Sequence, residues 1–518
     1  MQKGIAITVF VSGMVSLAVE MAASRLLGNY FGASNLIWAT IIGLILIYLT
    51  AGYFLGGAWA DRSPKASSFY QILLWAGLSI GLIPIISRPI LRIAANAFDG
   101  LQLGAMIGAF VAVLILFSIP VTLLGTASPF AIRLSLQDSR QAGSIAGRIY
   151  AISTLGSFIG TFLPGLVLIP LIGTFRTFLA FSLILILTAW IGLLTVSGWR
   201  KAAWYIWMPV VIVLLAVFGL HGTDKTSTGM IYETESAYNY IQVLEQNGYT
   251  ILRLNEGQGM HSMYHPTQLN YFGPWEQVLV APFFNDAPFD IGKVCSMAIV
   301  GLAAGTTARQ ASQVYPAIQI DGIEIDPKIV SAGRTYFDMN EPNLTVIIQD
   351  GRYALANSRK KYDIISVDAY RPPYIPWHMT TQEFFQTVYD HLTDTGAMAI
   401  NVGRAESDRR LIEALVGTIR SVFPSVYVMD LPNSFNSIVF ATRQPTRAEN
   451  LQQNFLALSQ RTGTPPLLLD TMAVTLTNLQ LTPLSKTVYT DDLTSIEWLT
   501  NDLVMSFFLN GELKGLQQ

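Results

Sequence analysis

The sequence predicts a multi-domain protein in which an α-helical transmembrane bundle is followed by a small β-domain and an α/β domain with a parallel sheet. The first observation is composition: 51% of the 518 residues are hydrophobic and only 13% are charged, about half the charged share of typical soluble domains. The second is the uneven distribution of carboxylates, because residues 1–222 contain only Glu20, Asp61, Asp99 and Asp138. The third is the alternation of strand-like and helix-like segments in the polar half that follows.

Residues 1–222 contain about seven apolar stretches of the roughly 20 residues that a membrane-spanning helix needs. The first stretch carries Glu20 and Arg25 and lacks a small-residue cleavage site, so we interpret it as a retained helix and not as a signal peptide. Small residues recur in Gly52–Gly57 and Ser153–Thr161, which predicts close helix packing. The predicted spans lie near residues 4–27, 36–59, 69–88, 103–125, 149–172, 175–197 and 203–220.

Glu20 lies within the first predicted span, where a carboxylate is costly and is therefore a candidate functional group. The alternative is a structural ion pair with Arg25 or with an arginine of another helix. The short segment Gly57–Arg62 resembles the loop between helices two and three of major-facilitator transporters. The sequence shows no second, repeated half, so we do not expect an independent transporter.

The polar half begins with a predicted linker and a small β-domain over residues 223–290. Two alternating runs, residues 238–246 and 249–257, are separated by Asn247 and Gly248, a dipeptide typical of β-hairpin turns. From Lys293 onwards, five apolar strand segments alternate with helical stretches. This alternation predicts an α/β domain over residues 291–518, with a parallel sheet covered by helices on both faces.

Glycines and acids follow four successive strands of the predicted sheet. Ligands bind beyond the carboxyl ends of parallel strands, so we expect these residues to form one site. The two glycines of GLAAGTTAR allow the backbone to approach a ligand, and an acid about 20 residues further on suits a ribose diol. The pattern predicts an adenosyl-cofactor site, although Glu324 and Asp350 could also serve only as helix caps. The residues are Gly301, Gly305, Glu324, Asp350, Gly351 and Asp368.

Taken together, several segments resemble the spermidine synthases, which are aminopropyltransferases. The closer resemblance is to the fused form, in which a membrane region related to major-facilitator proteins precedes that domain. The resemblance implies a Rossmann-like, methyltransferase-type fold in which the β-domain forms one wall of the site. It covers most of residues 230–510 and rests on Glu235–Val243, the glycine loop, Gly322–Pro327, Gln349–Arg352, Asp368–Tyr370, Thr380–Phe385 and Thr490–Glu497.

The family reaction moves an aminopropyl group from decarboxylated S-adenosylmethionine to an amine. The resemblance implies that Asp368 accepts the proton that the amine must lose, since a free alkylamine is protonated at neutral pH. It further implies that Glu324 binds the ribose and Asp350 the adenine. The remaining cofactor-binding candidates are Gly301, Gly305, Gly351 and Asn239, and the substrate-binding candidates of the following loop are Tyr370, Arg371, Tyr374 and Trp377.

The sequence departs from the family on the amine side of the site. Ala304 and Arg371 replace two acids that contact the aminopropyl end of the cofactor and the far ammonium of a diamine, and Asn239 and Met260 replace two glutamines of the β-wall. These changes should weaken the binding of a dication such as putrescine. Two alternatives therefore stay open: a methyltransferase that uses intact S-adenosylmethionine, and a non-catalytic polyamine or nucleoside sensor coupled to the membrane bundle.

The expected partners are a small-molecule amine acceptor and the lipid bilayer, and a homo-oligomer is left open. The chain has no basic run of the kind that binds nucleic acid. His261, His265 and His378 lack a metal-ligand spacing, so we expect no metal. The single cysteine, Cys295, lies in an apolar run and is expected to be a buried hydrophobic residue.

The expected location is the cell (inner) membrane, as a multi-pass protein. Lys and Arg favour the loops after the second, fourth and sixth spans, so the positive-inside rule places the N-terminus in the cytoplasm and, with seven spans, the C-terminal half outside. The nucleoside cofactor, by contrast, is made in the cytoplasm, which favours a cytoplasmic domain. A re-entrant segment near residues 87–102 would reconcile the two arguments.

Overall fold

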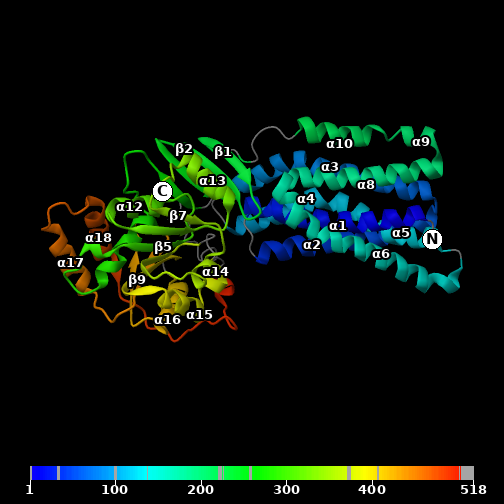
Figure 1. Ribbon diagram of the computed structural model, residues 1–518. Helices are drawn as coiled ribbons and strands as arrows, with labels where there is room; N and C mark the ends of the chain where they lie inside the picture. The colour runs from blue at the N-terminus through cyan, green and yellow to red at the C-terminus, as the bar shows by residue number, and fades with distance from the viewer. Residues whose placement is uncertain are drawn as a thin grey trace. The chain divides into compact units, whose positions relative to one another are not determined.

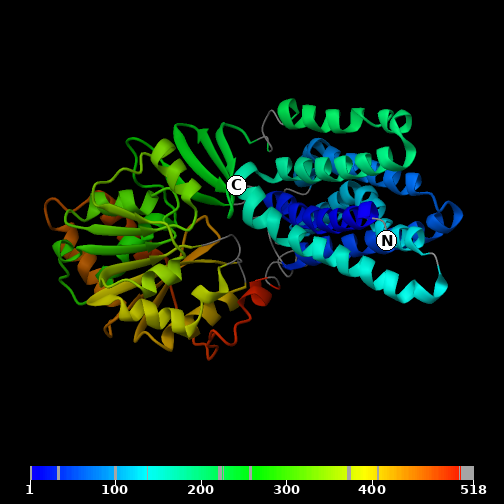
Figure 2. The same ribbon diagram turned by 45° about the vertical axis from the view of Figure 1, so that its right-hand side comes forward.

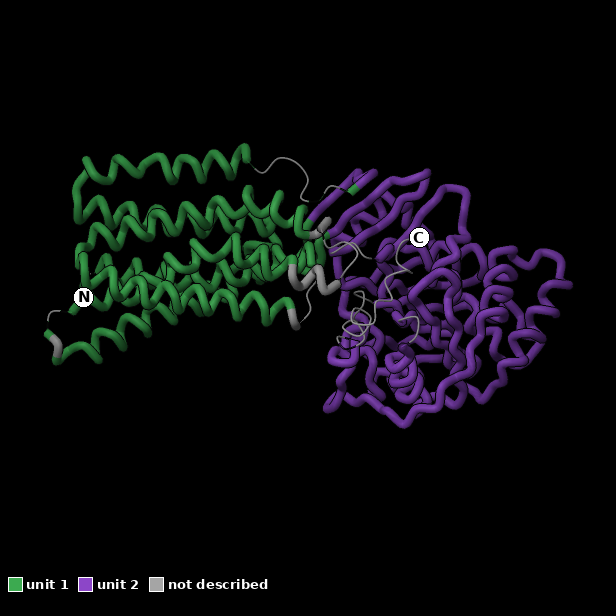
Figure 3. Tube along the Cα trace, turned by 180° about the vertical axis from the view of Figure 1, so that it is seen from behind, with its two compact units in different colours: residues 1–227, 235–240 green, residues 228–234, 241–518 purple. Residues whose placement is uncertain are grey.

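The computed structural model describes residues 3–31, 35–97, 102–136, 138–219, 225, 227–255, 259–369, 375–404, 408–500 and 502. The chain divides into two compact units, shown in different colours in Figure 3. Residues 1–227 and 235–240 form the first unit, and residues 228–234 and 241–518 form the second.

The first unit is a helical bundle (Figure 1). Among the described residues it contains seven helices long and apolar enough to cross a membrane, as the sequence predicts. Figures 1 and 2 both show α3 and α8 running side by side. The long helices are α1 (Lys3–Phe31), α2 (Asn35–Arg62), α3 (Ala66–Ala97), α4 (Gln102–Gly125), α6 (Ala142–Leu163) and α8 (Thr174–Ser197), and the seventh apolar segment comprises α9 (Trp199–Ala203) and α10 (Trp207–Phe218). Shorter elements are α5 (Ala127–Ser135), η1 (Ser139–Gln141), η2 (Pro164–Leu168) and α7 (Ile169–Ile172).

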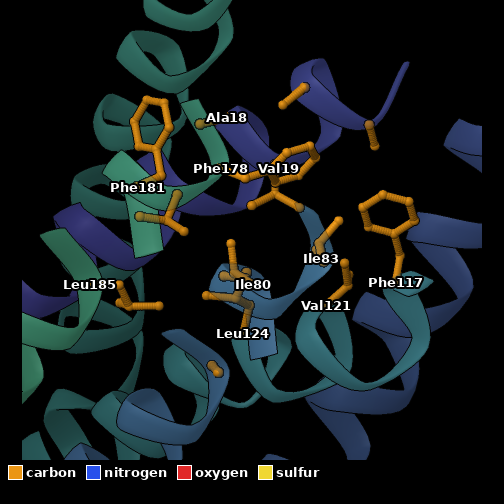
Figure 4. Packing of buried hydrophobic residues seen from close by; sticks show 14 of the residues in the cluster. Ala18, Val19, Ile80, Ile83, Phe117, Val121, Leu124, Phe178, Phe181 and Leu185 are labelled. Carbon is orange, nitrogen blue, oxygen red and sulfur yellow. The ribbon is translucent and has the colours of Figure 1, made fainter. Parts of the chain in front are cut away.

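The core of the bundle contains apolar side chains from most of its helices, among them Ile80 of α3, Val121 of α4 and Phe178 of α8 (Figure 4). The glycines of α6 lie directly against α1. An added Cβ at Gly156 or Gly160 would lie 2.0 Å from a main-chain oxygen of α1. This close approach confirms the predicted small-residue packing of α6, which is how helices associate where lipid replaces water.

Residues 235–240 cluster with the helices and are held there by polar groups. The Glu235 carboxylate accepts hydrogen bonds from Arg25 Nε at 3.0 Å and from the main-chain nitrogen and hydroxyl of Thr174 at 3.0 and 2.6 Å. Arg25 also donates to the carbonyl oxygen of Ser236 at 2.7 Å. Arg25 therefore pairs with Glu235, so the alternative of a structural pair between Glu20 and Arg25 does not hold.

A four-stranded sheet in the order β1-β2-β3-β4 precedes the α/β region. The predicted hairpin is confirmed, since β2 and β3 pair antiparallel and Gln246 lies opposite Tyr249. Asn247 and Gly248 have φ angles of 52° and 83°, the left-handed conformation that a two-residue turn of this type requires. The strands are β1 (Met230–Glu235), β2 (Tyr240–Gln246), β3 (Tyr249–Leu254) and β4 (Met260–Tyr264).

The larger sheet has eight strands in the order β12-β10-β11-β9-β8-β5-β6-β7. The five strands from β9 to β7 are parallel, as predicted. β10, β11 and β12 extend the β9 edge with antiparallel pairing, which the sequence reading did not anticipate. The strands are β5 (Ser296–Val300), β6 (Gln319–Ile323), β7 (Leu344–Ile347), β8 (Tyr362–Val367), β9 (Leu392–Gly403), β10 (Ser425–Asp430), β11 (Asn436–Thr442) and β12 (Leu479–Gln480).

Helices cover both faces of this sheet (Figures 1 and 2), and successive residues of β5 alternate between the two cores. Met297 and Ile299 pack with α12, α17 and α18, whereas Ala298 and Val300 pack with α14, α15 and α16. The elements are α11 (Pro274–Gln277), η3 (Val278–Phe284), η4 (Ile291–Lys293), α12 (Thr306–Val314), α13 (Pro327–Tyr336), α14 (Gly351–Ala356), η5 (Trp377–Met379), α15 (Gln382–Asp390), α16 (Arg410–Arg420), α17 (Glu449–Ser459) and α18 (Pro466–Asn478).

Cys295 is exposed, so the prediction that it is buried was wrong. The apolar run that contains it becomes a strand only at Ser296, and Cys295 lies just before the sheet begins.

Candidate active site

Four neighbouring parallel strands, β8, β5, β6 and β7, end at the same edge of the larger sheet. Val300 pairs with both Val367 and Ile323, and Ile323 pairs with Ile347. The residues that follow these strands therefore come together, as predicted for the carboxyl ends of a parallel sheet. They include Gly301, Glu324, Asp350 and Asp368.

The glycine loop after β5 passes directly against the end of β8. Gly301 has a φ of +95°, and an added Cβ would lie 2.5 Å from the main-chain carbonyl of Asp368. Gly305 has a φ of +90° and directly precedes α12. Both positions require glycine, because a side chain would be strained at this φ and would clash with neighbouring atoms.

Glu324 is 8% exposed and fixes the glycine loop. Its carboxylate accepts hydrogen bonds from the main-chain nitrogens of Ala303 at 2.9 Å and Asp326 at 3.0 Å. Burial raises the pKa of Glu324 to about 7, against the lowering effect of these hydrogen bonds. The cap of α13 is Asp326 and not Glu324, so helix capping does not explain Glu324. Each carboxylate oxygen can accept a further hydrogen bond, as a ribose diol would require.

Asp350 is the N-cap of α14, so the capping alternative holds for this residue. Its Oδ1 accepts a hydrogen bond from the main-chain nitrogen of Tyr353 at 2.9 Å. Its Oδ2 lies 3.5 Å from Nε2 of His378, and the side chain is 39% exposed. Capping thus occupies one oxygen, and the other remains accessible beside His378.

Asp368 is paired with Asn401, a residue that is not among the sequence-predicted site residues. Asn401 on the adjacent strand β9 donates a hydrogen bond from Nδ2 to Oδ1 of Asp368 at 3.0 Å. Burial raises the pKa of Asp368 to about 7, and the Asn401 hydrogen bond opposes this rise. Asn401 Oδ1 is buried without a hydrogen-bond partner among the described residues. The available signal was a lone amide in the apolar run AMAINV.

Ala304, which the family resemblance matches to an acid, is 3% exposed within an apolar cluster. The cluster includes Ile241, Leu252 and Phe337, so strands of the β-domain pack against the glycine loop. The main-chain nitrogen of Ala304 also donates to Oγ of Ser262 on β4 at 2.9 Å. A carboxylate at position 304 would have to be buried among these apolar groups.

The structure thus brings together Gly301, Gly305, Glu324, Asp350, Gly351 and Asp368. Asn239 lies in the β1–β2 turn, within the first unit. Trp377 is 42% exposed on η5, and its ring meets that of His378 edge-on. The other substrate-binding candidates, Tyr370, Arg371 and Tyr374, lie outside the described residues.

Across the described chain, no group of three or more His, Cys, Asp or Glu residues could hold a metal ion.

The mainly parallel sheet and the glycines and acids at its strand ends define an α/β domain with a ligand site at the carboxyl ends of its strands. The spermine/spermidine synthase domain model matches residues 291–452. A probable polyamine aminopropyl transferase of Bifidobacterium longum is 33% identical over 324 residues, which cover 58% of this chain and 69% of the relative. The polyamine aminopropyltransferase of Vibrio vulnificus is 28% identical over 242 residues, covering 44% and 78%. The chain belongs to the polyamine aminopropyltransferase family, and its C-terminal half is an aminopropyltransferase domain.

Among solved structures, a probable spermidine synthase from Corynebacterium glutamicum is similar with a TM-score of 0.38 and 20% sequence identity. The similarity covers 46% of this chain and 90% of that chain.

With Asp368 as the proton acceptor, kcat/KM falls at low pH as Asp368 becomes protonated. Replacing Asn401 with Ala is expected to move this fall in kcat/KM to higher pH. A hydrogen bond to a charged group contributes about 1.5–3 kcal/mol, so the expected shift is about one pH unit or more. The sign follows from the lost donor, which had favoured the ionised form of Asp368. Asn450→Ala is the matched control, since Asn450 is equally buried and donates to Asp286 away from the strand ends. An unchanged profile for Asn401→Ala would refute the pairing.

Proposed function

We propose that this chain is a membrane-attached transferase that moves an aminopropyl group from decarboxylated S-adenosylmethionine to an amine, with Asp368 as the proton acceptor. The supporting observation is the convergence of Gly301, Glu324, Asp350 and Asp368 at one sheet edge, in a member of the aminopropyltransferase family. The amine acceptor places the reaction in polyamine biosynthesis or a variant of it.

In the proposed step, the amine nitrogen attacks the propyl carbon bonded to the sulfonium sulfur. The carbon–sulfur bond breaks, and its electron pair remains on sulfur in a neutral thioether nucleoside. Asp368 accepts the proton that the amine loses, and Asn401 holds one carboxylate oxygen in place. A pKa of about 7 gives this carboxylate more basicity than an ordinary aspartate while leaving it largely ionised above neutral pH.

We assign the nucleoside to the glycine loop, Glu324 and Asp350. Glu324 already accepts two main-chain hydrogen bonds, and its remaining lone pairs would accept hydrogen bonds from the ribose hydroxyls. The accessible Oδ2 of Asp350 would accept a hydrogen bond from the adenine edge. Gly305 and Gly351 allow the backbone to approach the nucleoside, and Asn239 is carried over from the family resemblance as a further cofactor-binding residue.

The acceptor is proposed to be an amine with less positive charge than a diamine dication. Ala304 is packed in an apolar cluster, and the sequence places Arg371 where the family has its second acid. A close pair of like charges costs binding energy, so a cation at position 371 disfavours a distal ammonium. Tyr370, Tyr374 and Trp377 would then cover the less charged part of the acceptor.

Methyl transfer from intact S-adenosylmethionine is the second candidate, and Ala304 favours it because intact cofactor carries a carboxylate at that end. Calorimetry with the full-length protein in detergent separates the two. Tighter binding of the decarboxylated cofactor supports aminopropyl transfer, and tighter binding of the intact cofactor supports methyl transfer. Binding of neither cofactor would contradict both enzyme assignments and leave the sensor alternative. A polyamine would then be the next ligand to titrate.

The protein is proposed to reside in the cell (inner) membrane with its catalytic domain in the cytoplasm, where the nucleoside co-substrate is made. Seven spans then place the N-terminus outside. The positive charges after the second, fourth and sixth spans favour the opposite orientation, and labelling of a single residue distinguishes the two.

The exposed Cys295 makes that measurement simple, because it is the only cysteine of the chain. A membrane-impermeant maleimide is expected to label Cys295 only after cells are permeabilised, and the Cys295→Ser variant is expected to remain unlabelled throughout. Equal labelling in intact cells would place the catalytic domain outside, as the positive charges indicate.

A further inference from the structure

Thr490–Glu497, a segment near the C-terminus, reaches the adenine side of the proposed site. Arg352 lies in the first turn of α14, two residues after Asp350. Its guanidinium forms a bidentate pair with Asp491, with Nη1 to Oδ1 at 2.7 Å and Nη2 to Oδ2 at 2.6 Å. The same Nη1 donates to the carbonyl oxygen of His378 on η5 at 2.8 Å. One arginine therefore joins three separate segments.

Asp491 is itself fixed by α15, which begins just after η5. The hydroxyl of Thr381, the N-cap of α15, donates to Asp491 Oδ1 at 2.7 Å. The main-chain nitrogen of Asp491 donates to Oε2 of Glu383 at 3.0 Å. The guanidinium of Arg352 lowers the pKa of Asp491, so the carboxylate stays ionised at neutral pH. Bidentate arginine–carboxylate pairs restrict orientation more strongly than single contacts do.

The element held by this pair lies beside Asp350. His378 Nε2 is 3.5 Å from Asp350 Oδ2, and Trp377 meets His378 edge-on with ring centroids 5.7 Å apart. Met379 lies close to Gly351, where an added Cβ would be 3.1 Å from Cε of Met379. Moving η5 would therefore move the side chains that surround the accessible oxygen of Asp350.

We propose that Arg352 and Asp491 form a clamp that positions η5, and with it His378 and Trp377, around the nucleobase of the co-substrate. The two residues are positioning residues, since they act through η5 and need not touch the ligand. The proposal rests on the proposed function, because it takes Asp350 as the adenine-binding residue. It gives the segment Thr490–Glu497 a role in nucleoside affinity.

The test measures the affinity of the full-length protein for 5′-methylthioadenosine, the thioether nucleoside that aminopropyl transfer releases, by calorimetry. Asp491→Asn preserves the shape of the side chain but removes the charge. We expect its Kd to rise about tenfold, with the kcat at saturating co-substrate and the KM for the amine within about twofold of wild type. Arg352→Lys keeps the positive charge but loses the planar guanidinium that binds both carboxylate oxygens. We expect a smaller rise in Kd for this variant.

Arg461→Gln is the control, because Arg461 forms a 2.9 Å ion pair with Asp290 away from the strand ends. Its Kd should equal that of wild type. A wild-type Kd in both clamp variants would overturn the clamp while leaving the proposed function standing. A wild-type protein that binds neither this nucleoside nor the decarboxylated cofactor would overturn the proposed function and the clamp with it. If Asp491→Asn fails to fold, Arg352→Lys alone decides the outcome.

Discussion

Replacing Asp368 with Asn is expected to abolish transfer while leaving nucleoside binding largely intact. The amide cannot accept the proton that the amine must lose, and a positioned general base commonly contributes a factor of about 10² to 10⁴ in rate. Binding should persist, because the residues assigned to the nucleoside, Glu324 and Asp350, hold their positions through main-chain hydrogen bonds that do not involve Asp368. Single-turnover rates and calorimetry measure the two effects separately.

The pH dependence of the wild-type enzyme provides an independent check on the same residue. Burial raises the pKa of Asp368 to about 7, so its acceptor form is lost as the pH falls through about 7. We expect kcat/KM to decrease as the pH falls over that range. The residual activity of Asp368→Asn should not show this decrease. Turnover that survives the substitution unchanged would show that Asp368 is not the base.

The second large effect is expected from Glu324→Gln. Both carboxylate oxygens of Glu324 accept main-chain hydrogen bonds, whereas a Gln amide has only one accepting oxygen. One buried N–H would lose its partner, at a cost of about 1–3 kcal/mol, and the glycine loop would lose its fixed position. Together with a weakened ribose contact, this should raise the nucleoside Kd about tenfold to a hundredfold, as measured by calorimetry.

Glu276→Gln is the matched control for this substitution. Glu276 is also buried and also has a pKa raised by burial to about 7, and it accepts hydrogen bonds from Gly273 and Gln310 away from the strand ends. The control should lower the midpoint of thermal unfolding without changing the nucleoside Kd. Equal losses of affinity in the two variants would show that Glu324 acts through stability alone.

Most features that depend on local sequence or on the connectivity of parallel strands were predicted correctly, with the exposed Cys295 as an exception. The Asn247–Gly248 turn follows from its dipeptide, and the convergence of Glu324 and Asp368 follows from the parallel connectivity of the strands. The seven helices of the described residues that are long and apolar enough to cross a membrane follow from length and hydropathy. Each of these depends on a pattern within one segment or on a general rule of sheet topology.

Features that depend on which segments meet could not be predicted from the sequence. Asn401 acquires its role only because β9 pairs beside β8. Arg25 pairs with Glu235, more than 200 positions away in the sequence, so the alternative of a Glu20–Arg25 pair does not hold. The Arg352–Asp491 pair likewise joins two motifs whose separate resemblance to the family gave no indication of contact.

Aminopropyl transfer from decarboxylated S-adenosylmethionine is measured by incubating the full-length protein with this co-substrate and a panel of monoamines and diamines, and by identifying the products by mass spectrometry. We predict release of 5′-methylthioadenosine and an amine heavier by one aminopropyl group, with the less charged acceptors preferred. Consumption of intact S-adenosylmethionine with methylation of the acceptor, or no consumption of either cofactor, would contradict the account.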